Sequence, residues 1–219
     1  RALLHQVQSG EPEEQRSRYV SRLLWLASSA DPDASREVIR QAARDDEVDT
    51  LRSLARERSE REPESVILLS GLLRVYGERD LAIEALRRSA RQHPSDFWLS
   101  FHMALALRAV AGDPTRRDRR GLLLESLGYF RAAISARPGS REARHLLGAS
   151  FEDLGLWRDA RAEFEEMIRR DPSDGHARAH LAYCLARIDG WPVALEAARI
   201  AAEDAPEDEY VLGRYARAL

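Results

Sequence analysis

Two histidines, His176 and His180, are the residues of this 219-residue chain whose type and spacing most directly suggest chemistry. They are four positions apart, which places both side chains on one face of a helix, an arrangement that can chelate a metal ion. No nearby cysteine and no clearly placed carboxylate completes a ligand set. We therefore expect no metal and no cofactor. An enzyme acting through the histidines is kept as a third functional class, which elemental analysis for zinc or nickel would test.

Other catalytic motifs are absent from the sequence. The chain has no lysine, which excludes Schiff-base chemistry and the strand lysine that a protein kinase needs. It has no Gly-x-Ser-x-Gly elbow, no Walker loop and no paired-cysteine motif. Glu163, Glu165 and Glu166 lie among arginines, a pattern typical of a solvated helix surface. We expect no catalytic residue in this segment.

The composition is typical of a helical protein with hydrated outer faces, since 44% of the residues are hydrophobic and 32% are charged. The near balance of 34 basic and 37 acidic residues gives no reason to expect a nucleic-acid partner. No apolar run approaches the roughly 18 residues of a membrane span, so we expect no membrane contact. The single cysteine, Cys184, fits a reducing compartment, and we expect a cytoplasmic protein. Because the sequence opens at Arg1 and not at a methionine, we expect a piece cut from a longer chain.

Two stretches of the sequence match each other at a fixed offset of 34 residues. Leu147-Gly148, Phe151, Leu154, Trp157, Ala160 and Pro172 recur as Leu181-Ala182, Leu185, Ile188, Trp191, Ala194 and Pro206. Such a period predicts helical hairpins that bury their apolar faces only by stacking on one another. The small residues Gly148 and Ala160 matter because two helices cross closely only where a side chain is nearly absent.

Helix boundaries are clearest in residues 141–174. The apolar spacing predicts a first helix over about Arg141 to Leu154, ended by Gly155. A second helix follows and stops at Asp171-Pro172. The pair forms one predicted hairpin.

These positions resemble the tetratricopeptide repeat family, whose Leu-Gly-x-x-Tyr, Ala, Phe, Ala and Pro positions are met by Leu147-Gly148, Phe151, Ala160, Phe164, Met167 and Pro172. The resemblance implies an all-α, right-handed superhelical solenoid of stacked helix-turn-helix hairpins. It divides the chain into an N-terminal helix or cap (1–30), a degenerate hairpin (31–62), four repeats (63–96, 97–140, 141–174 and 175–208) and a C-terminal capping helix or further repeat (209–219). Pro94 and Pro138 are 44 residues apart instead of 34, so the repeat 97–140 should carry ten extra residues in an inserted loop at 111–121.

A second resemblance comes from the blocks at residues 25–33 and 86–107. They are similar to the repeat region that follows the catalytic domain in large bacterial Ser/Thr protein kinases of the eukaryotic type. The resemblance implies a parent kinase for which this segment recruits substrates or regulators. It lends no kinase chemistry to the segment itself.

A binding surface is implied by the family, in which certain first-helix positions face a concave groove. By that rule the partner-binding groove receives Arg74, Trp98, Phe101, His102, Arg108, His145, Glu152, His176, His180, Tyr183, Arg187 and Arg214. A mixture of aromatic residues and arginine suits protein recognition, although Trp98 and Phe101 could instead pack between adjacent hairpins. The family's clamp for a terminal carboxylate uses lysine and asparagine, and this chain has neither. Arginines would have to supply the charge for an acidic or phosphorylated peptide.

We therefore expect a protein-interaction scaffold with a protein or peptide ligand. The alternative is a structural spacer or a self-association module, in which exposed hairpins stack end to end into a homo-oligomer. The basic stretch Asp113 to Gly121 favours a solvated connector over a nucleic-acid contact, with docking on an adjoining domain as a further alternative. Trp157, in a turn between helices, is expected to pack within its own hairpin.

Overall fold

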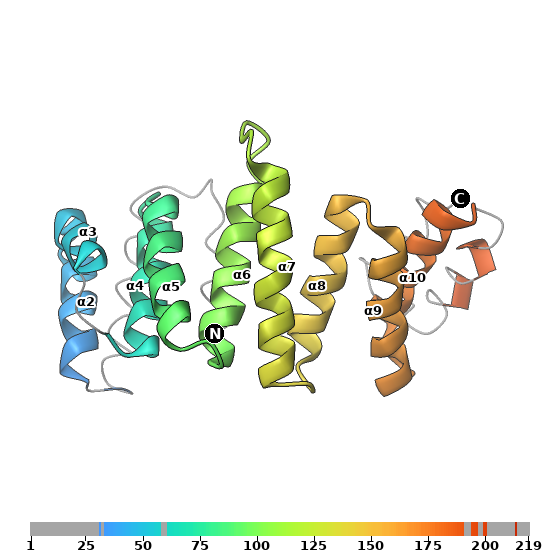
Figure 1. Cartoon of the computed structure of the whole chain (residues 1–219), viewed down its shortest axis with the longest axis horizontal. Coiled ribbons are helices and arrows are strands. Elements are labelled where there is room, and N and C mark those ends of the chain that lie inside the picture. Colours follow the sequence, from blue (N-terminus) through green and yellow to red (C-terminus); the bar gives the residue numbers. More distant parts are fainter. Residues whose placement is uncertain are drawn as a thin grey trace. The chain divides into compact units, whose positions relative to one another are not determined.

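The computed structural model describes residues 31, 33–57, 61–190, 194–196, 199–200 and 213, and every regular element in this part of the chain is an α-helix (Figure 1). The chain divides into two compact units, Arg1–Arg91 and Gln92–Leu219. The N-terminal helix expected at 1–30 lies outside the described residues, as does the segment expected at 209–219 apart from Gly213.

The first unit contains the helices α2 (Ala34–Arg44), α3 (Val48–Arg56), α4 (Pro63–Val75) and α5 (Arg79–Gln92). Polar contacts join successive hairpins of this unit. The hydroxyl of Tyr76, which follows α4, lies 2.9 Å from the Ala43 carbonyl of α2. Arg52 of α3 donates from Nε to Glu78 at 2.9 Å. The α2–α3 and α4–α5 hairpins are thus held together by side chains as well as by their apolar faces.

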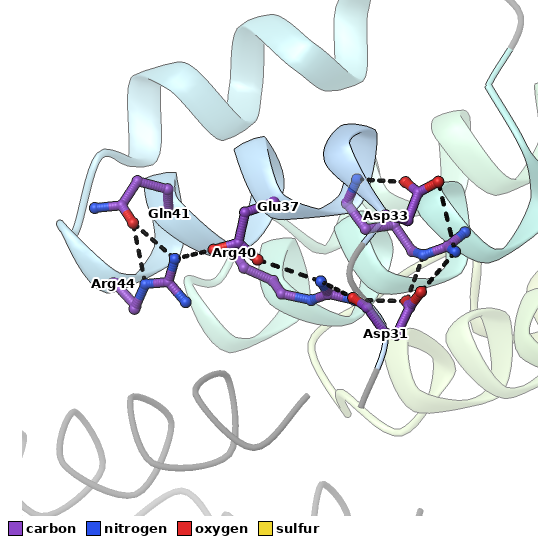
Figure 2. Close-up of polar contacts among 7 residues, drawn as sticks. Asp31, Asp33, Glu37, Arg40, Gln41 and Arg44 are labelled. Atoms are coloured by element: carbon purple, nitrogen blue, oxygen red, sulfur yellow. Dashed lines mark hydrogen bonds and ion pairs between the residues drawn. The ribbon is translucent and has the colours of Figure 1, made fainter. Parts of the chain in front are cut away.

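An ion-pair network fixes the start of α2 (Figure 2). The N-cap Asp33 accepts a hydrogen bond of 3.0 Å from the backbone amide of Arg36. Asp31 accepts from Arg36 Nε and from Arg40 Nη2, both at 2.6 Å. Hydrogen bonds from Arg36, and then from Arg40, lower the pKa of Asp31 to about 2. Because Arg40 is only 2% exposed, this carboxylate offsets much of the cost of burying its guanidinium.

The second unit contains α6 (Phe97–Ala111), α7 (Arg119–Ala136), α8 (Arg141–Leu154), α9 (Trp157–Arg170) and α10 (Gly175–Ile188). The predicted bounds of the first helix in residues 141–174 are confirmed, and the second helix stops directly before Asp171-Pro172. Gly155 ends α8 in a left-handed conformation with φ of 74°, which glycine adopts without steric cost. Side chains of Asp96, Ser140 and Asp174 cap the starts of α6, α8 and α10.

The insertion between α6 and α7 differs from the predicted loop at 111–121. Only residues 112–118 connect the two helices, whereas residues 155–156 connect α8 and α9. The helices are also longer, with 15 residues in α6 and 18 in α7 against 14 in each of α8 and α9. Half of the ten extra residues therefore extend the helices. Arg119 supports this extension by donating from Nε to the carbonyl of Ala111, the last residue of α6.

One apolar core runs through the helices of the second unit. Phe130 of α7, Leu147 of α8 and Phe164 of α9 are almost fully buried within it. The predicted close approach at Gly148 is confirmed, since a Cβ added there would lie 2.7 Å from Cζ of Phe164. The α8–α9 hairpin is thus packed around a position where only glycine fits.

Candidate functional site

The predicted groove residues of the second unit lie on α6, α8 and α10, which are the first helices of three successive predicted hairpins. We call these residues, together with Asp153 of α8, the first-helix face. It comprises Trp98, Phe101, His102 and Arg108 of α6, His145, Glu152 and Asp153 of α8, and His176, His180, Tyr183 and Arg187 of α10. Polar contacts link neighbouring first helices. Arg108 pairs with Asp153 between α6 and α8 at 2.7 Å, and His145 meets His180 between α8 and α10.

Three of these residues form a connected group that we call the His–His–Glu relay, consisting of His145, His180 and Glu152. The Nε2 atoms of His145 and His180 are 3.2 Å apart. The Nδ1 atom of His180 lies 3.0 Å from each carboxylate oxygen of Glu152. His145 and Glu152 are seven residues apart on α8, so they lie two turns apart on one face, and His180 of α10 contacts both.

The relay is enclosed by apolar packing. His180 is 3% exposed, and the ring of Phe164 stacks on it with centroids 4.5 Å apart. The thiol of Cys184 lies 3.6 Å from Oε1 of Glu152. Burial lowers the pKa of His145 from 6.5 to about 4, and the nearby His180 adds to this effect. His145 is therefore neutral near pH 7, because its charged form would lose hydration without gaining an anionic partner.

An ion pair joins the starts of α8 and α10. Arg141 donates from Nε and Nη2 to the two carboxylate oxygens of Asp174, at 2.7 and 2.8 Å. Asp174 also accepts from the backbone amide of Ala177 at 3.0 Å. Burial alone would raise the pKa of Asp174, but the hydrogen bonds from Arg141 and Ala177 outweigh burial and lower it. The carboxylate is held ionised where it caps α10.

Arginine and aromatic side chains meet at the C-terminal end of α10. The guanidinium of Arg187 lies 4.9 Å from the ring centroid of Trp157, and the ring of Tyr183 contacts Trp157 edge-on at 5.6 Å. A cation over an indole face is attracted by the ring quadrupole. Trp157 is thus more than the hairpin-packing residue expected from its position, because it orients two groove residues of α10.

The two predicted aromatic groove residues of α6, Phe101 and Trp98, differ in how they are packed. Phe101 is buried in the core, with its ring 6.3 Å from that of Phe130. Trp98 is half-buried and contacts Phe97 edge-on at 4.8 Å. The guanidinium of Arg137, directly after α7, covers both Phe97 and Trp98 at 4.4 and 4.9 Å. Phe101 is therefore a core side chain, whereas Trp98 keeps part of its surface exposed.

The structure brings some predicted groove residues together and separates others. His145, Glu152 and His180 are joined, but His180 is buried between helices and offers a ligand almost no surface. Arg74 belongs to the first unit, where burial lowers its pKa and no hydrogen-bond or ion-pair partner faces it among the described residues. Arg214 lies outside the described residues.

One residue of the first-helix face, Asp153, was not among the predicted groove residues. It follows Glu152 on α8 and occupies the last groove position of the family rule, so the same positional argument could have identified it. Its contact with Arg108 was beyond that argument, because the two residues are 45 positions apart in the sequence. This pair neutralises one of the arginines that were expected to select an acidic ligand.

The described part of the chain carries no group of three or more histidine, cysteine, aspartate or glutamate side chains placed to hold a metal ion. Although His176 and His180 share α10, the two ring nitrogens of His180 face Glu152 and His145 instead. Among the described helices, none has both the length and the apolar character needed to cross a membrane.

Comparison with known proteins identifies the fold. No protein-family model and no curated protein matches the sequence. Among solved structures, the chain is similar to TTC0263, a thermophilic TPR protein of Thermus thermophilus, with 20% identity, a TM-score of 0.56, and coverage of 92% of this chain and 98% of that one. It is also similar to MamA, residues 41 to the end, from Desulfovibrio magneticus RS-1, with 17% identity, a TM-score of 0.61, and coverage of 87% and 97%. These likenesses confirm the predicted all-α class of stacked helical hairpins.

Proposed function

We propose that this chain is a protein-interaction scaffold that binds a peptide or a partner protein along the first-helix face of the second unit. The observation that carries the proposal is the exposed and unpaired side chain of Arg187 in the described part of the chain. Its side chain is exposed and rests on Trp157, and no carboxylate pairs with it among the described residues. Arg108, on the same face, is already paired with Asp153. Arg187 is therefore the guanidinium of this face that is held in place and still has donors for a ligand.

The chemistry around Arg187 suits a protein ligand. An arginine stacked on an aromatic ring keeps the N–H groups on its edge available, and these match the two oxygens of a carboxylate or phosphate. The neighbouring rings of Trp157 and Tyr183 supply the apolar contact area that interface centres use. An acidic or phosphorylated segment is the ligand class that this combination favours.

The wider context is part of the same proposal. The sequence resemblance to bacterial Ser/Thr kinases supports a role in which the scaffold recruits substrates or regulators to a catalytic domain in the same parent chain. The structural neighbours support the stacked-hairpin fold that such scaffolds use. The DNA sequence upstream of the Arg1 codon tests this context directly, because it should encode a kinase domain in the same reading frame.

Affinity capture from the source organism tests the binding proposal. Proteins retained by the wild-type chain should be lost with Arg187→Glu, because the substitution reverses the charge of the proposed contact. Arg158→Glu is the matched control, since Arg158 is an exposed arginine of α9 outside the first-helix face. Equal loss with both variants would indicate a general charge effect and would contradict the proposal.

Self-association is the second candidate function, and the surface of α7 favours it. Leu124 is 47% exposed there, and a Cβ added at Gly121 or Gly128 on the same helix would meet no atom within 4 Å. A second chain could approach α7 closely at these positions. Light scattering over a range of concentrations should then give a rising mass that Leu124→Glu abolishes. A constant monomer mass would exclude this candidate.

A further inference from the structure

The His–His–Glu relay connects two helices that are not consecutive in the chain. α8 supplies His145 and Glu152, α10 supplies His180, and α9 lies between them in sequence. Each contact of the relay therefore crosses from one predicted hairpin to the next. Both imidazoles can take up a proton, so the hydrogen bonds of the relay depend on how many protons the two rings hold.

The hydrogen-bond directions within the relay follow from its chemistry. An ionised carboxylate only accepts, so the Nδ1 atom of His180 must carry a hydrogen toward Glu152. In a neutral His180 the Nε2 atom is then a lone-pair acceptor, and Nε2–H of His145 must donate to it across the 3.2 Å contact. One hydrogen thus occupies the space between the two Nε2 atoms.

Protonation changes this contact in two distinct steps. A first added proton goes to Nε2 of His180, the ring that hydrogen-bonds the Glu152 carboxylate, and His145 can accept that hydrogen at its own Nε2 once it carries its hydrogen on Nδ1. A second added proton must go to Nε2 of His145, where it meets the N–H of His180. Two N–H groups would then face each other between two cationic rings, at a separation where like charges repel strongly in a buried site.

Most of the titratable or charged side chains near the two rings in the described part of the chain are positive or neutral. Among the described residues, the titratable or charged side chains near His145 and His180 include Arg108 on α6, Arg141 and Glu152 on α8, and His176 and Cys184 on α10, while α9 contributes Glu163, which pairs with Arg144. Arg141 and Arg108 are themselves positive and disfavour a charge on His145. Glu152 supplies the carboxylate that accepts from His180, and a single anion can balance one protonated ring.

We propose that the His–His–Glu relay is an acid-sensitive latch: it holds α10 against α8 while at most one of the two imidazoles is protonated, and it releases α10 when both are. The burial of His180 under Phe164 strengthens the effect, because water screens the charge of this ring poorly while the helices are packed together.

The latch has a consequence for ligand binding that rests on the proposed function. The first-helix face includes both α8 and α10, so a ligand that spans them would be released in acid. Opening of the latch is measurable in the chain alone, and its failure is therefore distinguishable from a failure of the binding proposal.

Side-chain NMR of the 219-residue chain, labelled with ¹⁵N, tests the latch directly. At pH 7.5 we expect His180 as the Nδ1–H tautomer and His145 as the Nε2–H tautomer. On acidification, the amides of α10 should lose their protection from hydrogen exchange over the same pH range in which the second of the two rings is protonated. After correction for intrinsic exchange, the opening constant should rise about tenfold per pH unit for each proton taken up. His180 as the Nε2–H tautomer, or two charged rings in a fully protected α10, would overturn the proposal.

Two variants complete the test. His145→Gln replaces the titrating ring by an amide that can accept from or donate to His180 at any pH, so α10 should stay protected to lower pH than in the wild type. His93→Gln is the matched control, because His93 is an exposed histidine of the α5–α6 connection, and its profile should equal that of the wild type. Acid opening of His145→Gln at the wild-type pH would contradict the latch. If this variant does not fold at neutral pH, the tautomers of His145 and His180 and the amide protection of α10 in the wild type still test the proposal.

Discussion

Arg141, the first residue of α8, holds Asp174, the N-cap of α10, through two hydrogen bonds of 2.7 and 2.8 Å. The carboxylate is almost completely buried, whereas the arginine is largely exposed. One side chain thus both starts a helix and attaches it to the preceding hairpin. The two roles are separable, because an amide can cap a helix but cannot form an ion pair.

Asp174→Ala should destabilise the chain by about 1–3 kcal/mol, since it removes the cap and leaves Arg141 without its partner. Asp174→Asn should cost less, because the amide oxygen can still accept from Ala177. Urea denaturation followed by circular dichroism gives both values. Equal losses for the two variants would show that the cap contributes nothing measurable beyond the ion pair.

Gly148→Ala should destabilise the α8–α9 hairpin by about 1–3 kcal/mol, because the added Cβ would lie 2.7 Å from the buried ring of Phe164. Gly128→Ala is the matched control. Gly128 is in α7 with no atom within 4 Å of an added Cβ, so alanine should stabilise that helix by up to about 1 kcal/mol. The two substitutions should shift the midpoint of thermal unfolding in opposite directions. An unchanged midpoint for Gly148→Ala would contradict the close packing.

Glu152→Ala should cost about 1–3 kcal/mol, because Nδ1–H of the buried His180 would lose its acceptor. Glu152→Gln should be milder, since the amide oxygen can take the same hydrogen bond. Chemical denaturation at pH 7.5 measures both variants. If the alanine variant is no less stable than the glutamine variant, the contact does not stabilise the fold.

The stability of the chain should fall as the pH is lowered from about 6.5 to about 4, in the range set by His145. The pKa of His145 lies near 4 in the folded chain and at 6.5 in its unperturbed state, so the unfolded chain binds the proton more readily. Its contribution is therefore fully present above pH 6.5 and lost as the pH falls, with no further loss below about 4. Denaturation midpoints across this range, compared between the wild type and His145→Gln, isolate the effect. Parallel curves would mean that His145 does not titrate as described.

The insertion between α6 and α7 combines a longer connection with longer helices. The spacing of Pro94 and Pro138 correctly required ten extra residues between them. It did not reveal that half of these residues extend α6 and α7, since helix ends depend on contacts such as that of Arg119 with the Ala111 carbonyl. A repeat period counts residues, but it does not assign them to a helix or a loop.

The helical hairpins of the described part and the close approach of two helices at Gly148 were predictable from the sequence. Helical periodicity, cap residues and a small residue at Gly148 are local signals, and each has one favourable structural outcome. The partners of the predicted groove residues depend on the tertiary structure. His145 and His180 are 35 residues apart, and Arg108 and Asp153 are 45 apart, so their contacts arise only after the hairpins have stacked. Periodicity specifies the face on which a side chain lies, whereas its partner across that face depends on the spacing of neighbouring helices and on the choice of rotamers.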